Sequence, residues 1–550
     1  MVENTKKLMR DIPAVRWTAL LFLAFAMFCS YIFMDILSPI KDLMQSTRGW
    51  DSTAFGTMQG SETFLNVFIF FLIFAGIILD KMGVRFTAVL SGAVMLVGAS
   101  INWYAVTEGF MGSNLEAWFN ANLNYIPGFD ELGVSPFYRG MPASAKFASI
   151  GFMIFGCGVE MAGITVSRGI VKWFKGKELA LAMGSEMALA RLGVATCMIF
   201  SPVFAKLNGN IDVSRSVAFG LVLLMIALIM FIVYFFMDKK LDAQTGEAEE
   251  KDEPFQLKDL GKILSSVGFW LVALLCVLYY SAIFPFQKYA VNMLQCNLTF
   301  TPVAAESFWA STTCTIIQYL VMIVVAATAF ASNFSKKTTK FSLLILSVVS
   351  LIVFCWMGYM RQSAETIFSV FPLLAVGITP ILGKYVDNKG KAASMLMIGS
   401  ILLIVCHLTF AFILPLFRGS DWGVIVAYLT ILVLGASFSL VPAALWPSVP
   451  KLVDSKVIGS AYALIFWIQN IGLWLFPLLI GKVLDASNPE IVGAVKSGAM
   501  TPEVAATSYN YTNPLLMLAF LGVASLILGF VLKAIDKKKG LGLELPNIEN

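Results

Sequence analysis

The stretch Gly76-Ile-Ile-Leu-Asp80-Lys81-Met-Gly83-Val-Arg85 returns in altered form as Gly383-Lys-Tyr-Val-Asp387-Asn388-Lys389-Gly390-Lys391. Both copies have a glycine, an aspartate four residues later, a basic residue, and a glycine three residues after the aspartate. One such copy would be a weak pattern. Two copies at equivalent places in the chain predict that it consists of a duplicated half.

The sequence around both copies is that of a polytopic membrane protein. Of its 550 residues, 58% are hydrophobic and only 13% are charged, whereas soluble domains carry about 25% charged residues. A bilayer core of ~30 Å requires about 20 apolar residues for each crossing helix. On that rule the chain contains fourteen predicted spans, near residues 16–40, 58–79, 87–107, 147–167, 179–204, 215–237, 264–290, 309–332, 341–360, 364–383, 392–416, 422–447, 457–480 and 513–534.

The distribution of lysine and arginine orients these spans. Most of the 39 basic residues fall in the first, third and later odd-numbered connections, counting the N-terminal segment as the first. Because cytoplasmic loops carry the excess of Lys and Arg, both termini are expected to be cytoplasmic. The first span is long and lacks a small-residue cleavage site, so it is predicted to be a retained helix.

The duplicated pattern, placed between the second and third core helices of each half, resembles the loop signature of the major facilitator superfamily. The resemblance implies an all-α fold of two pseudo-symmetric six-helix bundles with alternating access to a central cavity. The predicted divisions are an N-terminal bundle (1–237), a cytoplasmic linker (238–263) and a C-terminal bundle (264–550). Two extra helices form an inserted hairpin at about 301–360, and the outer segment 108–146 is expected to form an ordered cap.

A conformational role is predicted for the loop residues and for one aspartate. Small residues let helices approach closely, and an aspartate at a helix end can hold a basic group in one conformational state. Asp35, near the outer end of the first span, is either a gate residue or a helix-end cap. The loop residues are Gly76, Asp80, Lys81, Gly83, Arg85, Gly383, Asp387 and Gly390.

Two charges lie where the bilayer should exclude them. Glu160 is halfway along the fourth span and Arg191 halfway along the fifth, and a charge at this depth costs roughly 2.5 to 3.5 kcal/mol on insertion scales. Because adjacent spans run antiparallel, the two side chains reach a similar depth. They form either a structural ion pair or a cavity site in which the carboxylate binds a cation and the guanidinium an anion. Hydrophobic residues stabilise as well as a buried pair, which favours the cavity site.

Other polar residues have weaker claims. Glu186, one helical turn from Arg191, is a candidate proton carrier, as is Glu160 itself. The single histidine, His407, has a pKa suited to a proton switch, although a hydrogen-bonded core histidine is the alternative. Glu62 and Lys288 are expected near the outer surface, where a lysine reaches the interface along its own stem.

Aromatic and amide side chains from the second half are expected to line the same cavity. Tyr280 belongs to the seventh span, Trp446 ends the twelfth, and Gln469 and Asn470 lie midway along the thirteenth. Tyr31 in the first span stands one turn from Asp35. A tryptophan near a helix end is commonly an interfacial anchor, so the combination carries the prediction.

A narrower resemblance rests on several patches in both halves. They are Trp173-Phe-Lys-Gly-Lys-Glu178-Leu, Ala190-Arg191-Leu-Gly193, Tyr279-Tyr280 with Phe284-Pro285-Phe286, Ala444-Leu445-Trp446-Pro447, and Gly459-Ser-Ala-Tyr462 with Ile468-Gln469-Asn470-Ile471-Gly472. They resemble a family of lysosomal dipeptide transporters within the superfamily.

The narrower resemblance implies roles for individual residues. Glu160 would hold the α-ammonium of a peptide, Arg191 would hold its α-carboxylate, and Trp446 would line the cavity. The resemblance also leaves room for an accessory membrane subunit; a monomer is otherwise expected. The N-terminus, Met1-Val-Glu-Asn-Thr, has no acidic dileucine signal, which favours the cell (inner) membrane of a prokaryote over a lysosomal membrane.

These features predict a transporter of dipeptides or similar zwitterions, by uniport or with protons. The alternative is a mono- or dicarboxylate carrier of the same superfamily, but an unprotonated Glu160 would repel such an anion. A non-transporting sensor or an enzyme is disfavoured, since the chain has neither a large soluble domain nor a nucleophile–base set. With one histidine and no Walker A loop, no metal, cofactor or ATP site is expected. The expected partners are the small-molecule substrate and the bilayer, with no nucleic acid.

Overall fold

The computed structural model describes residues 8–124, 137–245, 260–301, 303–453 and 458–546. All regular structure in these ranges is helical. The α-helices are α1 (Pro13–Met34), α2 (Lys41–Arg48), α3 (Ser52–Gly60), α4 (Phe64–Phe68), α5 (Phe71–Ala105), α6 (Asn114–Asn122), α7 (Ala143–Trp173), α8 (Leu179–Ala205), α9 (Val213–Thr245), α10 (Leu260–Leu264), α11 (Val267–Asn297), α12 (Thr312–Ser332), α13 (Lys337–Met360), α14 (Ala364–Lys389), α15 (Ala392–Leu408), α16 (Asp421–Leu445), α17 (Ile458–Ala486), α18 (Pro489–Lys496), α19 (Pro502–Ala506) and α20 (Thr512–Lys539).

In the described part of the chain, 13 helices are long and apolar enough to cross a membrane. One of them, α5, contains Gly83 with non-helical φ 79° and ψ 167°, so it consists of two arms that meet at the first loop pattern. Glycine adopts this positive φ without the steric penalty that a Cβ would bring. The second arm is the predicted third span, and the predicted second span is built from several shorter pieces.

The second span departs from the single helix that its hydrophobicity predicts. It begins as α3, continues through the 3₁₀ turn η3 (Ser61–Thr63) and α4, and resumes as the first arm of α5 after Phe70. Phe70 has φ 56°, a left-handed conformation that is uncommon outside glycine. Hydrophobicity alone does not reveal such a break, because every piece remains apolar.

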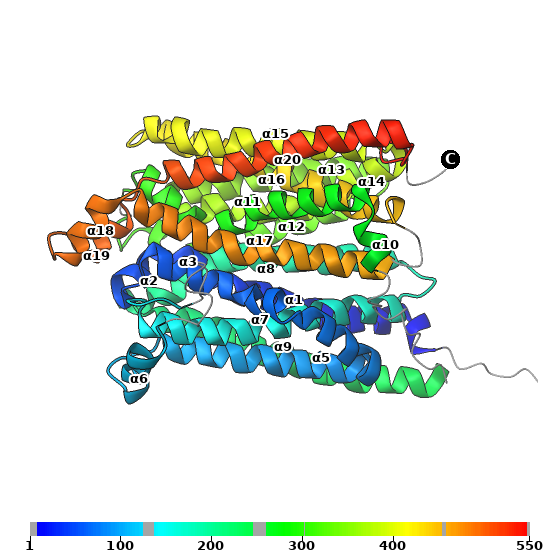
Figure 1. Cartoon of the computed structure of the whole chain (residues 1–550), viewed down its shortest axis with the longest axis horizontal. Coiled ribbons are helices and arrows are strands. Elements are labelled where there is room, and N and C mark those ends of the chain that lie inside the picture. Colours follow the sequence, from blue (N-terminus) through cyan, green and yellow to red (C-terminus); the bar gives the residue numbers. More distant parts are fainter. Residues whose placement is uncertain (1–7, 125–136, 246–259, 302, 454–457, 547–550) are drawn as a thin grey trace, which may run out of the picture.

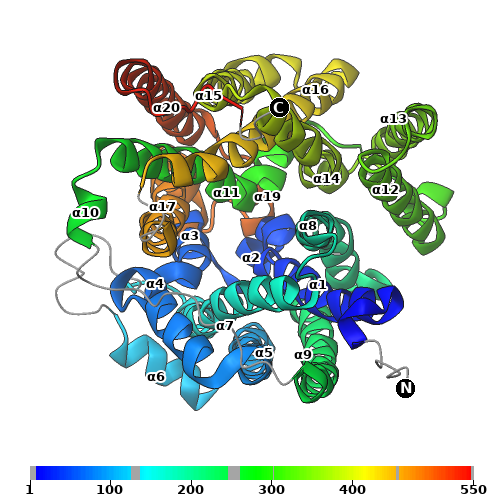
Figure 2. The same ribbon diagram turned by 90° about the vertical axis from the view of Figure 1, so that its right-hand side faces the viewer.

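The helices form two groups that follow chain order. Figure 1 shows the start of α1 and the end of α20 at one end of the molecule, and α6, α18 and α19 at the other. We call these ends the termini side and the opposite side. Figure 2 looks from the termini side and shows α1, α5, α7 and α9 together below, with α11, α15, α17 and α20 above.

The last helix of the first group is longer than the predicted boundary allows. We expected a linker from residue 238, but α9 continues to Thr245. The reason is that Asp238 and Asp242 belong to the helix and form ion pairs with Lys172 of α7, at 2.6 and 2.7 Å. Residues 246–259, the middle of the predicted linker, lie outside the described ranges.

The predicted insertion contains α12 and α13. Its first helix packs on α14 and also reaches α8 of the first group, where the Tyr319 hydroxyl lies 3.3 Å from that of Thr196. In the outer segment 108–146, α6 is held by Lys146, whose ammonium group donates to the carbonyl oxygen of Phe119 at 3.3 Å. The middle of that segment, 125–136, is not described.

Candidate substrate cavity

A cavity of about 1520 Å³ lies between the two helix groups. Its wall comes from α1, α3, α5, α7, α8 and α9 of the first group and from α11, α17 and the 3₁₀ turn η9 (Trp446–Lys451) of the second. On the termini side the lining reaches Arg10, Lys175 and Thr245, near the chain surface. Toward the opposite side it ends at Asp35, Gln59 and Lys288, all of which lie within the bundle.

Close backbone packing shuts the opposite side. A Cβ atom added to Gly56 would overlap the Pro477 carbonyl oxygen, and one added to Gly481 would overlap that of Ser52. These contacts join α3 to α17, one helix from each group. Only glycine permits helices to approach this closely, so the two groups are in direct contact here.

Polar contacts reinforce the same closure. The Lys288 ammonium group of α11 is 2.9 Å from an Asp35 carboxylate oxygen at the end of α1, and the Gln287 amide donates to the other oxygen at 2.6 Å. The Asp35 side chain is 1% exposed. Asp35 therefore bridges the two groups, as a gate residue would. Lys288 was expected to reach the interface but points inward to Asp35. Glu62 was expected near the outer surface but lines the cavity. The second span begins earlier than predicted, with α3, so Glu62 lies farther along it.

Lys41 forms a second bridge on the opposite side. It is 1% exposed, and its ammonium group donates to the Asn292 side-chain oxygen of α11 at 3.1 Å. The same group lies 5.3 Å from the ring centre of Tyr509 and 5.8 Å from that of Tyr289. A buried ammonium group surrounded by ring faces is stabilised without a carboxylate.

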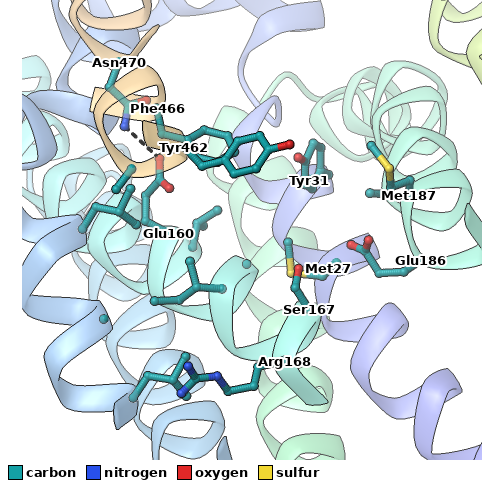
Figure 3. Close-up of a pocket in the computed structure, with 18 of the residues that line it drawn as sticks. Met27, Tyr31, Glu160, Ser167, Arg168, Glu186, Met187, Tyr462, Phe466 and Asn470 are labelled. Carbon is teal, nitrogen blue, oxygen red and sulfur yellow. Dashed lines mark hydrogen bonds between the residues drawn. The ribbon is translucent and has the colours of Figure 1, made fainter. Parts of the chain in front are cut away.

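Glu160 lies midway along α7 and faces the cavity. Figure 3 shows its carboxylate turned toward Asn470 of α17, and the Asn470 amide donates to it at 3.2 Å. This hydrogen bond connects the two helix groups about halfway along α7. A carboxylate with one neutral donor retains acceptor capacity for an incoming ammonium group.

Arg191 lies midway along α8 and faces the same cavity. Its guanidinium carbon is 4.8 Å from the ring centre of Phe438, 5.2 Å from Phe284 and 5.6 Å from Tyr31. Within the described ranges it forms no ion pair with Glu160. The structural ion pair, one of the two alternatives from the sequence, is therefore not formed. The cavity instead contains an acid and a base that do not contact each other.

The other predicted substrate contacts also line the cavity. The Trp446 indole donates to the Tyr280 hydroxyl at 3.1 Å, and the Tyr462 hydroxyl donates to the Trp446 carbonyl oxygen at 2.9 Å. Gln469 and Tyr31 complete the predicted set. Phe438 and Gln59 were not predicted from the sequence, because an aromatic residue or an amide within an apolar span gives no signal of its position.

Two of the three candidates for proton coupling, Glu186 and His407, lie in different surroundings. Glu186 lines the cavity on the same helix as Arg191, and Figure 3 places it near Met27 and Met187. His407 is fully buried, and its Nδ1 lies 2.9 Å from the carbonyl oxygen of Leu403. It is not among the residues that line the cavity, which matches the alternative of a core histidine.

The first loop pattern is held by ion pairs within its own group. Asp80 accepts from Arg168 of α7 at 2.7 Å, and Arg85 donates to Asp242 of α9 at 2.6 Å. Gly76 lines the cavity, whereas Lys81 is exposed. Both pairs lie on the termini side, where the cavity reaches the surface.

The second loop pattern is held differently. Gly383 and Asp387 lie in the last turns of α14, and Gly390 has φ 71°. The backbone after the chain's last helix packs against this turn, with Lys391 donating to the carbonyl oxygen of Glu544 at 3.1 Å. The two halves therefore share the pattern but secure it with different partners.

A protein-family model matches a large part of the chain. The model of the Major Facilitator Superfamily matches residues 23–367. The chain belongs to the Major Facilitator Superfamily. It is thus a multi-pass membrane transporter, and the fold class expected from the sequence is confirmed.

Curated relatives of the chain are lysosomal dipeptide transporters. The lysosomal dipeptide transporter MFSD1 of Danio rerio is 24% identical over 482 residues, covering 86% of this chain and 81% of the relative. The same transporter of Homo sapiens is 23% identical over 485 residues, with 86% and 81% covered. The narrower resemblance is therefore confirmed as well.

Solved structures of the superfamily share the fold. The nucleoside transporter NupG is 13% identical with a TM-score of 0.55, covering 94% of this chain and 99% of that one. A structure from work on substrate recognition in proton-dependent oligopeptide transporters is 12% identical with a TM-score of 0.55, covering 96% and 99%. A bacterial homologue of the human lysosomal transporter Spinster, inward-facing and occupied, is 12% identical with a TM-score of 0.56, covering 95% and 98%.

Proposed function

We propose that this transporter carries dipeptides or similar small zwitterions by alternating access of its two helix groups. The observation that carries the proposal is the separation of Glu160 and Arg191 within one cavity. A carboxylate and a guanidinium that line one cavity without pairing to each other match a ligand with an ammonium group at one end and a carboxylate at the other. The dipeptide transport named for the MFSD1 relatives supports the same substrate class.

The length of the substrate follows from the geometry of recognition. Two extended residues span at most about 7 Å, and a third adds up to about 3.6 Å. Recognition of the two ends ignores the side chains between them, so a fixed acid and base would select for peptide length and tolerate many residues. Trp446, Tyr280, Tyr31 and Gln469 would then contact the side chains or the peptide bond.

Binding of free and blocked peptides tests this proposal. A charge-assisted hydrogen bond contributes about 1.5–3 kcal/mol, and 1.4 kcal/mol is tenfold in affinity. N-acetylation or C-terminal amidation of alanyl-alanine should therefore weaken binding by at least about tenfold, measured by competition or thermal shift. Trialanine and succinate should also compete poorly. If succinate competes as well as the free dipeptide, the substrate is an organic anion instead.

We also propose that the termini side faces the cytoplasm, with the loop between α12 and α13 on that side. Thr338, at the start of α13, is exposed, and seven of the eight native cysteines are buried. A Thr338→Cys variant should react with a membrane-impermeant maleimide only when the cytoplasmic face is accessible. If the reagent labels this cysteine only from outside intact cells, the termini side faces outward and the proposed orientation is wrong.

In this orientation the cavity would open to the cytoplasm and the bridges of Asp35 and Lys41 would close the outer side. Transport requires that these contacts separate while the termini side closes. The loop pairs Asp80–Arg168 and Arg85–Asp242 are then expected to rearrange or to meet the other helix group. Glu186 and Glu160 remain the candidates for coupling to protons, since both carboxylates line the cavity.

A further inference from the structure

The guanidinium group of Arg191 is enclosed by aromatic rings from both helix groups. Tyr31 comes from α1 of the first group, whereas Phe284 comes from α11 and Phe438 from α16 of the second. We call these three rings the aromatic seat. A guanidinium within about 6 Å of a ring centre is attracted by the negative face of the ring, and all three distances satisfy this.

Two rings of the seat, Phe284 and Phe438, pack within the second group. Phe438 is 3% exposed, and its ring packs against Phe371 with centres 5.5 Å apart and against Phe284 at 5.6 Å. Phe284 in turn lies 5.5 Å from Tyr280. Phe284 and Tyr31 line the cavity, and Phe438 does not. The ring closest to Arg191 is therefore packed against other rings of the second group.

The acid of the site has an equivalent arrangement. Glu160 of the first group accepts a hydrogen bond from Asn470 of the second, at 3.2 Å. Both charges thus contact neutral side chains of the second group: an amide contacts Glu160, and the ring faces of Phe284 and Phe438 lie near Arg191. The protein supplies its own counterparts for both ends of the site, without joining the two charges to each other.

We propose that the aromatic seat is a positioning device that allows the transporter to change conformation with no dipeptide bound. The inference rests on the proposed function. When the two groups close around the middle of the membrane, water leaves the cavity and the guanidinium needs a partner there. With a dipeptide bound, the partner is its carboxylate. Without one, the rings of Phe438, Phe284 and Tyr31 take its place.

The seat also explains how return without substrate avoids a competing ion pair. Were Arg191 to pair with Glu160, a dipeptide would have to break that bond before binding to either residue. Attraction by rings is weaker than a bidentate guanidinium–carboxylate contact. An incoming carboxylate can therefore displace the rings, and Arg191 remains both stabilised and available.

A comparison of net uptake with exchange tests this inference. Net uptake into empty proteoliposomes requires the protein to return without substrate, whereas counterflow into liposomes preloaded with unlabelled alanyl-alanine does not. Phe438→Leu removes the ring but keeps an apolar side chain. It should lower net uptake about tenfold and leave counterflow within about twofold of wild type.

Two variants control for a purely structural effect. Phe371→Leu makes the same substitution in the ring that packs on Phe438, and no interaction of the Phe371 ring with Arg191 is present in the described structure. It should leave the ratio of net uptake to counterflow unchanged, and so should Phe438→Tyr, which keeps the ring. Binding of alanyl-alanine by thermal shift shows that each variant is folded.

The outcomes separate this inference from the proposed function. An unchanged ratio in Phe438→Leu, an equal loss of net uptake and counterflow, or the same altered ratio in Phe371→Leu would overturn the role of the seat. If wild-type protein shows no counterflow and no binding with any dipeptide, the proposed function itself fails.

Discussion

Replacing Glu160 with Gln should reduce dipeptide uptake by about 10- to 150-fold, because a charge-assisted bond of about 1.5–3 kcal/mol to the substrate ammonium is lost. Glutamine has nearly the same shape, and its side-chain oxygen can still accept from Asn470, which is 3.2 Å from Glu160. The variant should therefore express and elute as a single species. The measurement is initial uptake of labelled alanyl-alanine in proteoliposomes.

The matched control for this variant is Glu503→Gln. Glu503 lies in α19 on the opposite side, is exposed, and is distant from the cavity lining. It should transport at the wild-type rate. Wild-type uptake by Glu160→Gln would remove the ammonium-binding role from Glu160, whatever the behaviour of the control.

A methyl group at Gly481 should hold the opposite side open. A Cβ there would overlap the carbonyl oxygen of Ser52, and overpacking of this kind costs typically 1–3 kcal/mol. The penalty applies only to the conformation in which α3 and α17 touch, so Gly481→Ala should shift the equilibrium by about 5- to 150-fold toward outward opening. Transport should fall, since the closed state is part of the cycle.

Cysteine accessibility measures this shift. Gln59 is 2% exposed and lines the closed end of the cavity. A Gln59→Cys reporter should react at least several-fold faster from the opposite side when Gly481→Ala is also present. Gly493→Ala in α18 is the control, because a Cβ there meets nothing within 4 Å. Equal reaction rates in both backgrounds would contradict the role of glycine packing in closure.

The spans and the duplication could be predicted from sequence because they depend on local patterns. Twenty apolar residues must be helical in a bilayer, and the glycines at 83 and 390 mark turns with positive φ. The break at Phe70 could not be predicted, because hydrophobicity is the same on both sides of it. The extension of α9 could not be predicted, because two aspartates at the end of an apolar span are typical of a linker. Only the structure shows that Asp238 and Asp242 form ion pairs with Lys172 of α7.

The acid and base of the cavity could be predicted for a related reason. A charge in mid-membrane needs a polar environment, so Glu160 and Arg191 were conspicuous in a chain with few charges. The side chains that contact Glu160 and Arg191 could not be predicted in the same way. Asn470 was recognisable as polar, but nothing in the sequence placed it opposite Glu160, and Phe438 is one of 45 phenylalanines. Lys288 was predicted to lie at the interface. Its ion pair with Asp35 depends on how the two helix groups pack against each other, which the sequence does not show.

The central claim, that Glu160 binds the substrate ammonium group, is tested most directly by a thermodynamic cycle. Dissociation constants are measured for alanyl-alanine and N-acetyl-alanyl-alanine, each on wild-type protein and on Glu160→Gln. Acetylation should weaken binding at least about tenfold on wild type and less than about twofold on the variant, because the interaction it removes is already absent. An equal loss on both proteins would contradict the account, since the ammonium group would then be recognised elsewhere.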